Sequence, residues 1–200
     1  MPSRLQTLIA AAILSLALLI GVAALVYRAP GNGPISMGQA LIGGPFSLTD
    51  QNGRRVSDKD FLGKYMLVFF GYTYCPDVCP TELQVMTEAL GQMGAKGDTI
   101  QPIFISFDPE RDTPETLKAY VGNFSPRLIG LTGSADDIAA AAKAYRVYYS
   151  KVEKGAANDY LMDHSTIIYL MGPDGKFIKH FIYSTDAKAL AEALTAALSG

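Results

Sequence analysis

The hydrophobic positions of this chain are distributed unevenly, with one long uncharged run near the N-terminus and shorter runs after it. The long run extends from Leu8 to Val26, and as a helix rising about 1.5 Å per residue it matches the roughly 30 Å hydrocarbon core of a bilayer. A cleaved signal peptide would have a shorter apolar stretch and an A-x-A-like cleavage site after it, and neither is present. We therefore expect an uncleaved transmembrane signal-anchor over residues 8–26, preceded by a short cytoplasmic N-terminus over residues 1–7.

Proline and glycine dominate the segment that follows, where residues 29–34 have the sequence APGNGP. This composition is typical of a linker. We expect a linker over residues 27–40. Because no internal repeat and no second linker follows, residues 41–200 are expected to form one domain.

The shorter runs predict the elements of this domain. The segment Tyr65–Gly71 (YMLVFFG) is apolar throughout, as expected of a central strand that is covered on both faces. Before it, Asn52-Gly53 between two short alternating segments indicates a hairpin. Further strands are expected at residues 100–107, 129–132, 167–171 and 176–182, and helices at residues 81–93, from Thr113-Pro114 onward, from Ser134 to Tyr145 and from Thr185 to the C-terminus.

The predicted order is therefore β-hairpin, β, α, β, α, β, α, β, β, α. A central strand that leads into a cysteine-bearing helix, with an antiparallel strand pair and a helix at the end, is the thioredoxin-like arrangement. We predict an α/β domain of this type. The net charge of -2 and the pI near 5.7 argue against the basic patch that nucleic-acid binding requires, so no nucleic-acid partner is expected.

The residues most suited to a metal or redox site lie at the start of the first predicted helix. The two cysteines, Cys75 and Cys79, are too few for a disulfide scaffold and are better explained as a site. Their i, i+4 spacing places both sulfurs on one helix face, and a helix N-terminus favours thiolates. A redox pair would ordinarily be C-x-x-C, so this wider pair suits a cation as well as a redox-active disulfide.

Two thiolates need a third ligand, and the chain contains two histidines. His164 stands in a predicted loop directly before a strand, which in a thioredoxin-like fold faces the cysteine-bearing turn. His180 lies within the last predicted strand, at a position expected to be solvated. Two thiolates and the imidazole of His164 form a soft ligand set that suits copper, with zinc as the alternative metal because it would want a fourth ligand.

Three acidic residues are candidates for the surroundings of these ligands. Asp77 lies between the cysteines, Asp108 ends a predicted strand, and Asp163 directly precedes His164. Asp77 is explained equally well as a helix cap, and Asp108 is better explained as part of a turn paired with Arg111.

Several stretches resemble the Sco/SenC family of copper metallochaperones for cytochrome c oxidase assembly. The spacing C-P-x-x-C-P with a distant D-H-S is specific to it, although Tyr74 stands where family members often have His. The matching stretches, which extend from about residue 46 to the C-terminus, are residues 71–83 (GYTYCPDVCPTEL), 108–114 (DPERDTP), 131–133 (LTG), 144–149 (AYRVYY), 163–165 (DHS) and 172–175 (GPDG).

The resemblance implies that Cys75, Cys79 and His164 bind one copper ion and deliver it to the dinuclear copper site of an oxidase subunit. It also implies a periplasmic copper donor and a thiol reductant as partners. Residues 1–7 contain no Arg- and Ser-rich presequence, so we expect a single-pass protein of a bacterial inner membrane with its domain in the periplasm. We expect a metallochaperone and no enzyme; the alternative is a thiol–disulfide reductase that keeps the copper-site cysteines of the oxidase reduced.

Overall fold

The computed structural model describes Ser3 and residues 14–21, 42–154 and 160–199, and the chain divides into two units, residues 1–40 and 41–200. In the first unit, residues 14–21 are helical with exposed side chains. Among the described residues, no helix is long and apolar enough to cross a membrane. The rest of the predicted anchor, residues 8–13 and 22–26, and the whole predicted linker lie outside the described residues, so both stay predictions.

The second unit is built on a seven-stranded sheet with the order β2-β1-β5-β4-β3-β8-β9. Strands β3, β4 and β5 are parallel, and the remaining neighbours pair antiparallel. The predicted hairpin at the start of the domain and the predicted antiparallel strand pair near its end are confirmed. The strands are β1 (Ser47–Asp50), β2 (Arg55–Ser57), β3 (Tyr65–Gly71), β4 (Ile100–Ser106), β5 (Ile129–Thr132), β8 (Ile167–Met171) and β9 (Phe177–Ile182).

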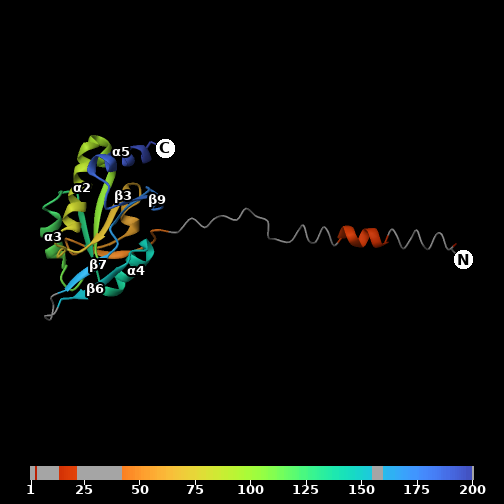
Figure 1. Cartoon of the computed structure of the whole chain (residues 1–200), viewed down its shortest axis with the longest axis horizontal. Coiled ribbons are helices and arrows are strands. Elements are labelled where there is room, and N and C mark those ends of the chain that lie inside the picture. Colours follow the sequence, from red (N-terminus) through yellow and green to blue (C-terminus); the bar gives the residue numbers. More distant parts are fainter. Residues whose placement is uncertain (1–2, 4–13, 22–41, 155–159, 200) are drawn as a thin grey trace. The chain divides into compact units, whose positions relative to one another are not determined.

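Helices lie on both sides of this sheet (Figure 1), which explains why β3 and β4 are buried along nearly their whole length. Helix α2 packs on α5, α3 on β5 and α4 on β1. Thr113 and Ser134 cap α3 and α4 as predicted, each accepting a hydrogen bond from a backbone N–H of the first turn. The helices are α2 (Val78–Gln92), α3 (Pro114–Val121), α4 (Ala135–Tyr145) and α5 (Ala187–Ala197), with short 3₁₀ helices η1 (Asp58–Phe61) and η2 (Gly94–Thr99).

Two predicted helix starts were wrong. Helix α2 begins at Val78, three residues before the expected start, so Pro80 is its third residue. A proline is tolerated there because the N–H groups of the first turn have no partner within the helix. Helix α5 is capped by Asp186 instead of Thr185, and the Asp186 carboxylate accepts the Ala189 N–H at 2.8 Å.

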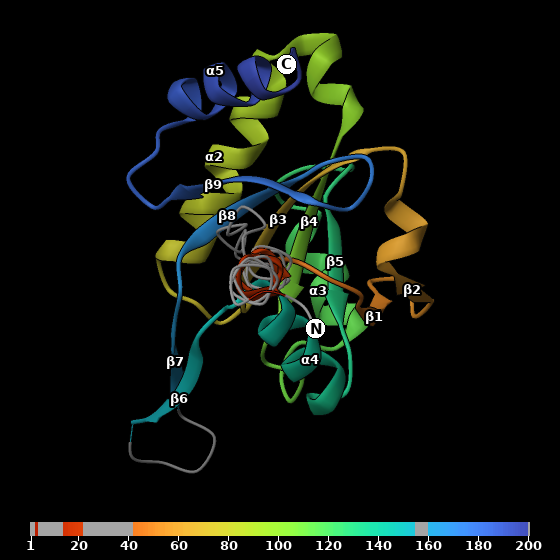
Figure 2. The same cartoon turned by 90° about the vertical axis from the view of Figure 1, so that its right-hand side faces the viewer.

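The sequence did not predict a second hairpin, formed by β6 (Tyr149–Glu153) and β7 (Tyr160–His164). It forms its own two-stranded sheet and extends away from the seven-stranded one (Figure 2). Most of β6 is exposed and contains lysine and glutamate, residues that are depleted in strands. His164, expected in a loop, is therefore the last residue of a strand.

Candidate metal centre

Three segments that are distant in sequence meet at the end of β3. The chain leaves β3 at Gly71, turns through Cys75 and enters α2, in whose first turn Cys79 lies. Strand β7 brings His164 to the same place. One sulfur atom from each cysteine and one ring nitrogen of the histidine all lie within 4.8 Å of one another.

The cysteine pair differs in exposure. Cys79 is fully buried, whereas Cys75 is partly exposed, and both are free thiols. The backbone N–H of Cys79 donates to Cys75 Sγ at 3.3 Å, as expected where the first turn of a helix has spare donors. The glycine at position 71 leaves room for the Cys79 sulfur beside the backbone of β3. A Cβ at that position would lie 2.8 Å from Cys79 Sγ and 2.7 Å from the Phe104 ring.

The two thiols also differ in acidity. The Cys79 thiol donates to Cys75 Sγ and, with the backbone N–H groups of Asp77 and Cys79, lowers the pKa of Cys75 to about 4 against the opposing effect of burial. The same interaction, together with burial, raises the pKa of Cys79. The pKa of Cys75 is thus lowered and that of Cys79 raised, so Cys75 is the more acidic thiol of the pair. A thiolate is both a nucleophile and a metal ligand.

The ring of His164 is held in one orientation. Its Nδ1 lies 3.1 Å from the carbonyl oxygen of Ser165, and because a carbonyl only accepts, Nδ1 carries the proton of the neutral ring. Nε2 then keeps its lone pair and lies 3.7 Å from Cys79 Sγ. The rings of Tyr72 and Phe107 lie beside the imidazole, with centroid distances of 6.0 and 5.0 Å. The hydrogen bond from Nδ1 to Ser165 is the usual way in which a histidine that binds a metal through Nε2 is oriented.

The donor set can hold one soft cation. Metal–thiolate bonds of about 2.3 Å would set three ligand atoms in trigonal geometry about 4 Å apart. The Cys79–His164 distance of 3.7 Å already fits this geometry, and the spread of 4.8 Å requires only a small closure. Two sulfurs and one imidazole suit copper, whereas a tetrahedral zinc ion would require a further ligand.

The three acidic residues expected around the ligands lie in different environments. Asp77 is the N-cap residue of α2, yet its side chain makes no capping hydrogen bond, and its backbone N–H helps to lower the pKa of Cys75. Asp108 is buried and pairs with Arg111, whose Nε lies 2.6 Å from Asp108 Oδ2, as the turn interpretation expected. Asp163 is exposed, because its neighbour His164 faces the site and successive strand residues point to opposite faces. Their roles at the site stay predictions.

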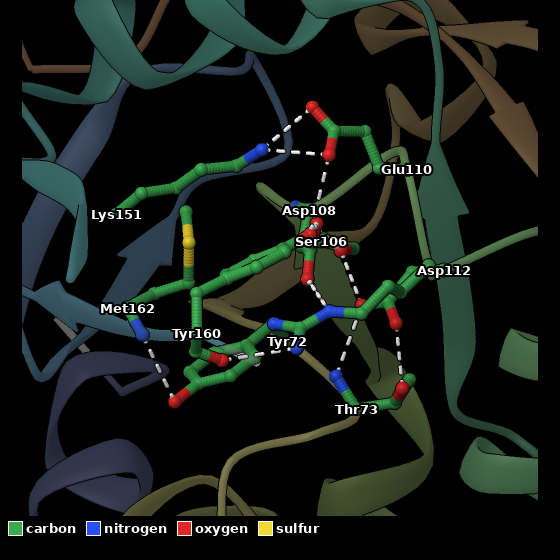
Figure 3. Close-up of polar contacts among 10 residues, drawn as sticks. Tyr72, Thr73, Ser106, Asp108, Glu110, Asp112, Lys151, Tyr160 and Met162 are labelled. Atoms are coloured by element: carbon green, nitrogen blue, oxygen red, sulfur yellow. Dashed lines mark hydrogen bonds and ion pairs between the residues drawn. The ribbon is translucent and has the colours of Figure 1, made fainter. Parts of the chain in front are cut away.

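Sequence reasoning named Asp108 but missed three polar residues that lie near it, Thr73, Asp112 and Tyr160 (Figure 3). Asp112 accepts hydrogen bonds from Thr73, and the hydroxyl of Tyr160 donates to Asp108. Asp112 stands inside the stretch DPERDTP, which the resemblance already marked, but nothing in its spacing indicated its partner. His180, by contrast, is exposed on β9 with its ring stacked on Phe177.

The chain has clear relatives. The family model described as SCO1/SenC matches residues 36–199. The mitochondrial SCO1 homolog of Mus musculus is 49% identical over 148 residues, which cover 73% of this chain and 52% of that protein. The chain thus spans about half the length of the curated relatives that it matches first.

Solved structures agree. Copper-bound ScoI of Bradyrhizobium japonicum is 50% identical, with a TM-score of 0.72 over 78% of this chain and 98% of that one. BsSco, a member of the Sco family of cytochrome c oxidase assembly proteins with a disulfide switch, is 27% identical, with a TM-score of 0.62 over 80% and 94% of the two chains. The fold is thus the thioredoxin-like α/β fold of Sco structures, and the chain belongs to the SCO1/SenC family.

Proposed function

We propose that this chain binds one copper ion through Cys75, Cys79 and His164 and delivers it to the dinuclear copper site of cytochrome c oxidase. The observation that carries the proposal is the convergence of two sulfurs and an oriented imidazole nitrogen within 4.8 Å. Copper-bound ScoI of Bradyrhizobium japonicum, which is 50% identical, supports the choice of metal, and BsSco supports the connection with oxidase assembly.

The unequal cysteines suggest how the ion enters and leaves. Cys75 is the more acidic thiol and is partly exposed, so it can take the ion from a donor first. Cys79 then loses its proton to solvent and becomes the second ligand, and the neutral Nε2 of His164 becomes the third. Release also begins at Cys75: incoming ligands of the oxidase subunit replace this cysteine first, because the buried Cys79 is less accessible.

The same chemistry implies partners and a compartment. A Cys75–Cys79 disulfide offers no thiolate, and the bacterial periplasm is kept oxidising, so a thiol reductant is needed to keep the pair reduced. A periplasmic copper donor would then supply the ion to the reduced pair. We propose that residues 8–26 anchor the chain in a bacterial inner membrane with the domain facing the periplasm. The first curated relatives are named mitochondrial.

A second candidate function is thiol–disulfide reduction, favoured by the contrast between the partly exposed, more acidic Cys75 and the buried Cys79. The Cys75 thiolate would attack a disulfide of the partner and release one partner thiolate. Cys79 would then lose its proton and attack Cys75 Sγ, releasing the second partner thiol and leaving this chain oxidised. Two electrons pass to the partner, and the imidazole takes no part in either bond exchange.

His164 separates the two functions. The test loads the reduced chain with Cu(I) against a fixed competing chelator and, in parallel, measures reduction of a model disulfide, for wild type, His164→Ala and His180→Ala. We expect one copper per chain and a loss of affinity only in His164→Ala, with little change in disulfide reduction. Unchanged copper affinity in His164→Ala would refute the three-ligand site, and an absence of copper binding in wild type would favour the reductase.

A further inference from the structure

The loop between β4 and α3 contacts both segments that carry the ligands. It contains two buried carboxylates, Asp108 (1% exposed) and Asp112 (0% exposed). Figure 3 shows the Asp112 carboxylate facing Thr73 and the Asp108 carboxylate facing Tyr160. Thr73 belongs to the segment that leads to Cys75, and Tyr160 begins the strand that ends at His164. The backbone of the loop is closed on itself, since the Asp112 N–H donates to the Asp108 carbonyl at 2.9 Å.

Asp112 holds the cysteine segment. Its Oδ2 accepts the backbone N–H of Thr73 at 2.9 Å, and its Oδ1 accepts the Thr73 hydroxyl at 2.5 Å. The Ser106 hydroxyl donates to Oδ2 at 2.5 Å and fastens the same carboxylate to the end of β4. Thr73 lies between the end of β3 and Cys75, so these bonds fix the segment from which Cys75 projects.

Tyr160 holds the histidine segment. Its hydroxyl donates to Asp108 Oδ1 at 2.7 Å, and its carbonyl accepts Arg111 Nη1 at 3.0 Å. The Arg111 guanidinium also lies 3.6 Å from the centroid of the Tyr160 ring, a cation–π contact. Tyr160 is the first residue of β7 and His164 the last. A strand is stiff over this length, so fixing its start restrains the imidazole at its end.

The fold alone does not require the Asp112 carboxylate. Thr113 caps α3, so the carboxylate of Asp112 is not used by the helix that follows it. Asp112 forms no ion pair within the described part of the chain, and burial without one costs stability. Burial also raises the pKa of Asp112. A costly group placed behind a site is a candidate for a role at that site.

We propose that this loop positions the two halves of the metal site through different residues: Asp112 acts on the cysteine pair through Thr73, and Tyr160, held by Asp108 and Arg111, acts on His164. The proposal rests on the proposed metal site, but its cysteine half also governs metal-free chemistry. A disulfide holds its own loop by a covalent bond, whereas the dithiol depends on outside restraint. Loss of the Asp112–Thr73 bonds therefore favours the disulfide over the dithiol.

The test uses the full chain with Asp112→Asn, Thr73→Val and Tyr160→Phe. The matched control is Asp50→Asn, because Asp50 is also a buried carboxylate at a turn (2% exposed), bonded to Arg54 and Asn52 on the β1–β2 hairpin. Two quantities are measured: the dithiol–disulfide equilibrium of the metal-free protein in a glutathione buffer, and Cu(I) affinity against a chelator.

We expect Asp112→Asn and Thr73→Val to shift the metal-free equilibrium toward the disulfide at least threefold, and Tyr160→Phe to leave it unchanged. All three should lower Cu(I) affinity about tenfold, as is usual when a residue that orients a ligand is lost. Asp50→Asn should change neither quantity.

Three results would overturn the proposal. An equal shift in Asp50→Asn would show a general effect of lost stability. An unchanged equilibrium in Thr73→Val, or a shift toward the dithiol in Asp112→Asn, would show that Asp112 acts by charge and not through Thr73. A disulfide shift in Tyr160→Phe would show that Tyr160 also acts on the cysteine pair, so that the two halves are not held by different residues. Should wild type bind no Cu(I) while Thr73→Val still shifts the equilibrium, the cysteine half stands and the proposed function fails.

Discussion

Glu82 makes the stability of this domain depend on pH. It lies in α2, one turn after Cys79, and is 1% exposed. Neither of its carboxylate oxygens has a hydrogen-bond partner among the described residues. Burial raises its pKa from the ordinary 4.5 to about 7. The folded state therefore binds this proton more tightly than the unfolded chain does.

The sign and size of the effect follow from this shift. The contribution of Glu82 to stability is fully present below pH about 4.5, where the carboxyl is neutral in both states. It is lost as the pH rises to about 7, because the unfolded chain ionises freely while the folded chain cannot. A shift of roughly 2.5 pKa units corresponds to about 3 kcal/mol of unfolding free energy.

The assay is urea denaturation of the reduced wild type and Glu82→Gln at intervals between pH 4.5 and 8. The variant has no charge to desolvate, so its unfolding free energy relative to wild type should rise by about 3 kcal/mol across this range. Any cost of burying the amide is constant with pH and cancels. Glu88→Gln is the matched control, since Glu88 is exposed on the same helix, and an equal rise in this variant would show that the effect does not come from burial of Glu82. A pH-independent difference for Glu82→Gln would refute the reasoning, because it would mean that the carboxylate is solvated or paired.

Three further predictions concern the metal site. His164→Ala should weaken Cu(I) binding at least tenfold in chelator competition, whereas His180→Ala, which changes an exposed side chain on β9, should have no effect; equal losses would contradict the ligand assignment. Gly71→Ala places a Cβ 2.8 Å from Cys79 Sγ, so denaturation should show a loss of about 1–3 kcal/mol from overpacking, with weaker copper binding; unchanged values would show that the site yields without cost. Oxidation of Cys75 and Cys79 to a disulfide should abolish Cu(I) binding, measured as copper retained after gel filtration, and undiminished stoichiometry would contradict the thiolate ligands.

Local patterns were sufficient for most of the fold. The apolar run of β3, the Asn52-Gly53 turn and the capping residues Thr113 and Ser134 each depend on neighbours in sequence, and each was predicted with correct or nearly correct bounds. The cysteine pair was also visible, because its spacing and its place at a helix start are local properties. The β6–β7 hairpin was missed because its exposed, charged strand has little hydrophobic alternation.

The tertiary structure decided which distant groups meet. The sequence favoured His164 over His180 through an assumed fold and through the family resemblance of residues 163–165. The 85 residues between Cys79 and His164 are brought together only when β7 lies beside the end of β3. The difference between the pKa values of Cys75 and Cys79 likewise depends on burial and on hydrogen bonds across the turn.

The partners of the polar residues behind the ligands were determined by the tertiary structure and not by local sequence. Asp112 and Thr73 are 39 residues apart, and Tyr160 and Asp108 are 52 apart. A residue type and its spacing predict what a side chain can do, and local backbone preferences predict the element that carries it. Which partner a buried carboxylate finds is determined by the sheet order and by the requirement that buried polar groups be bonded, and both of these are properties of the folded chain as a whole.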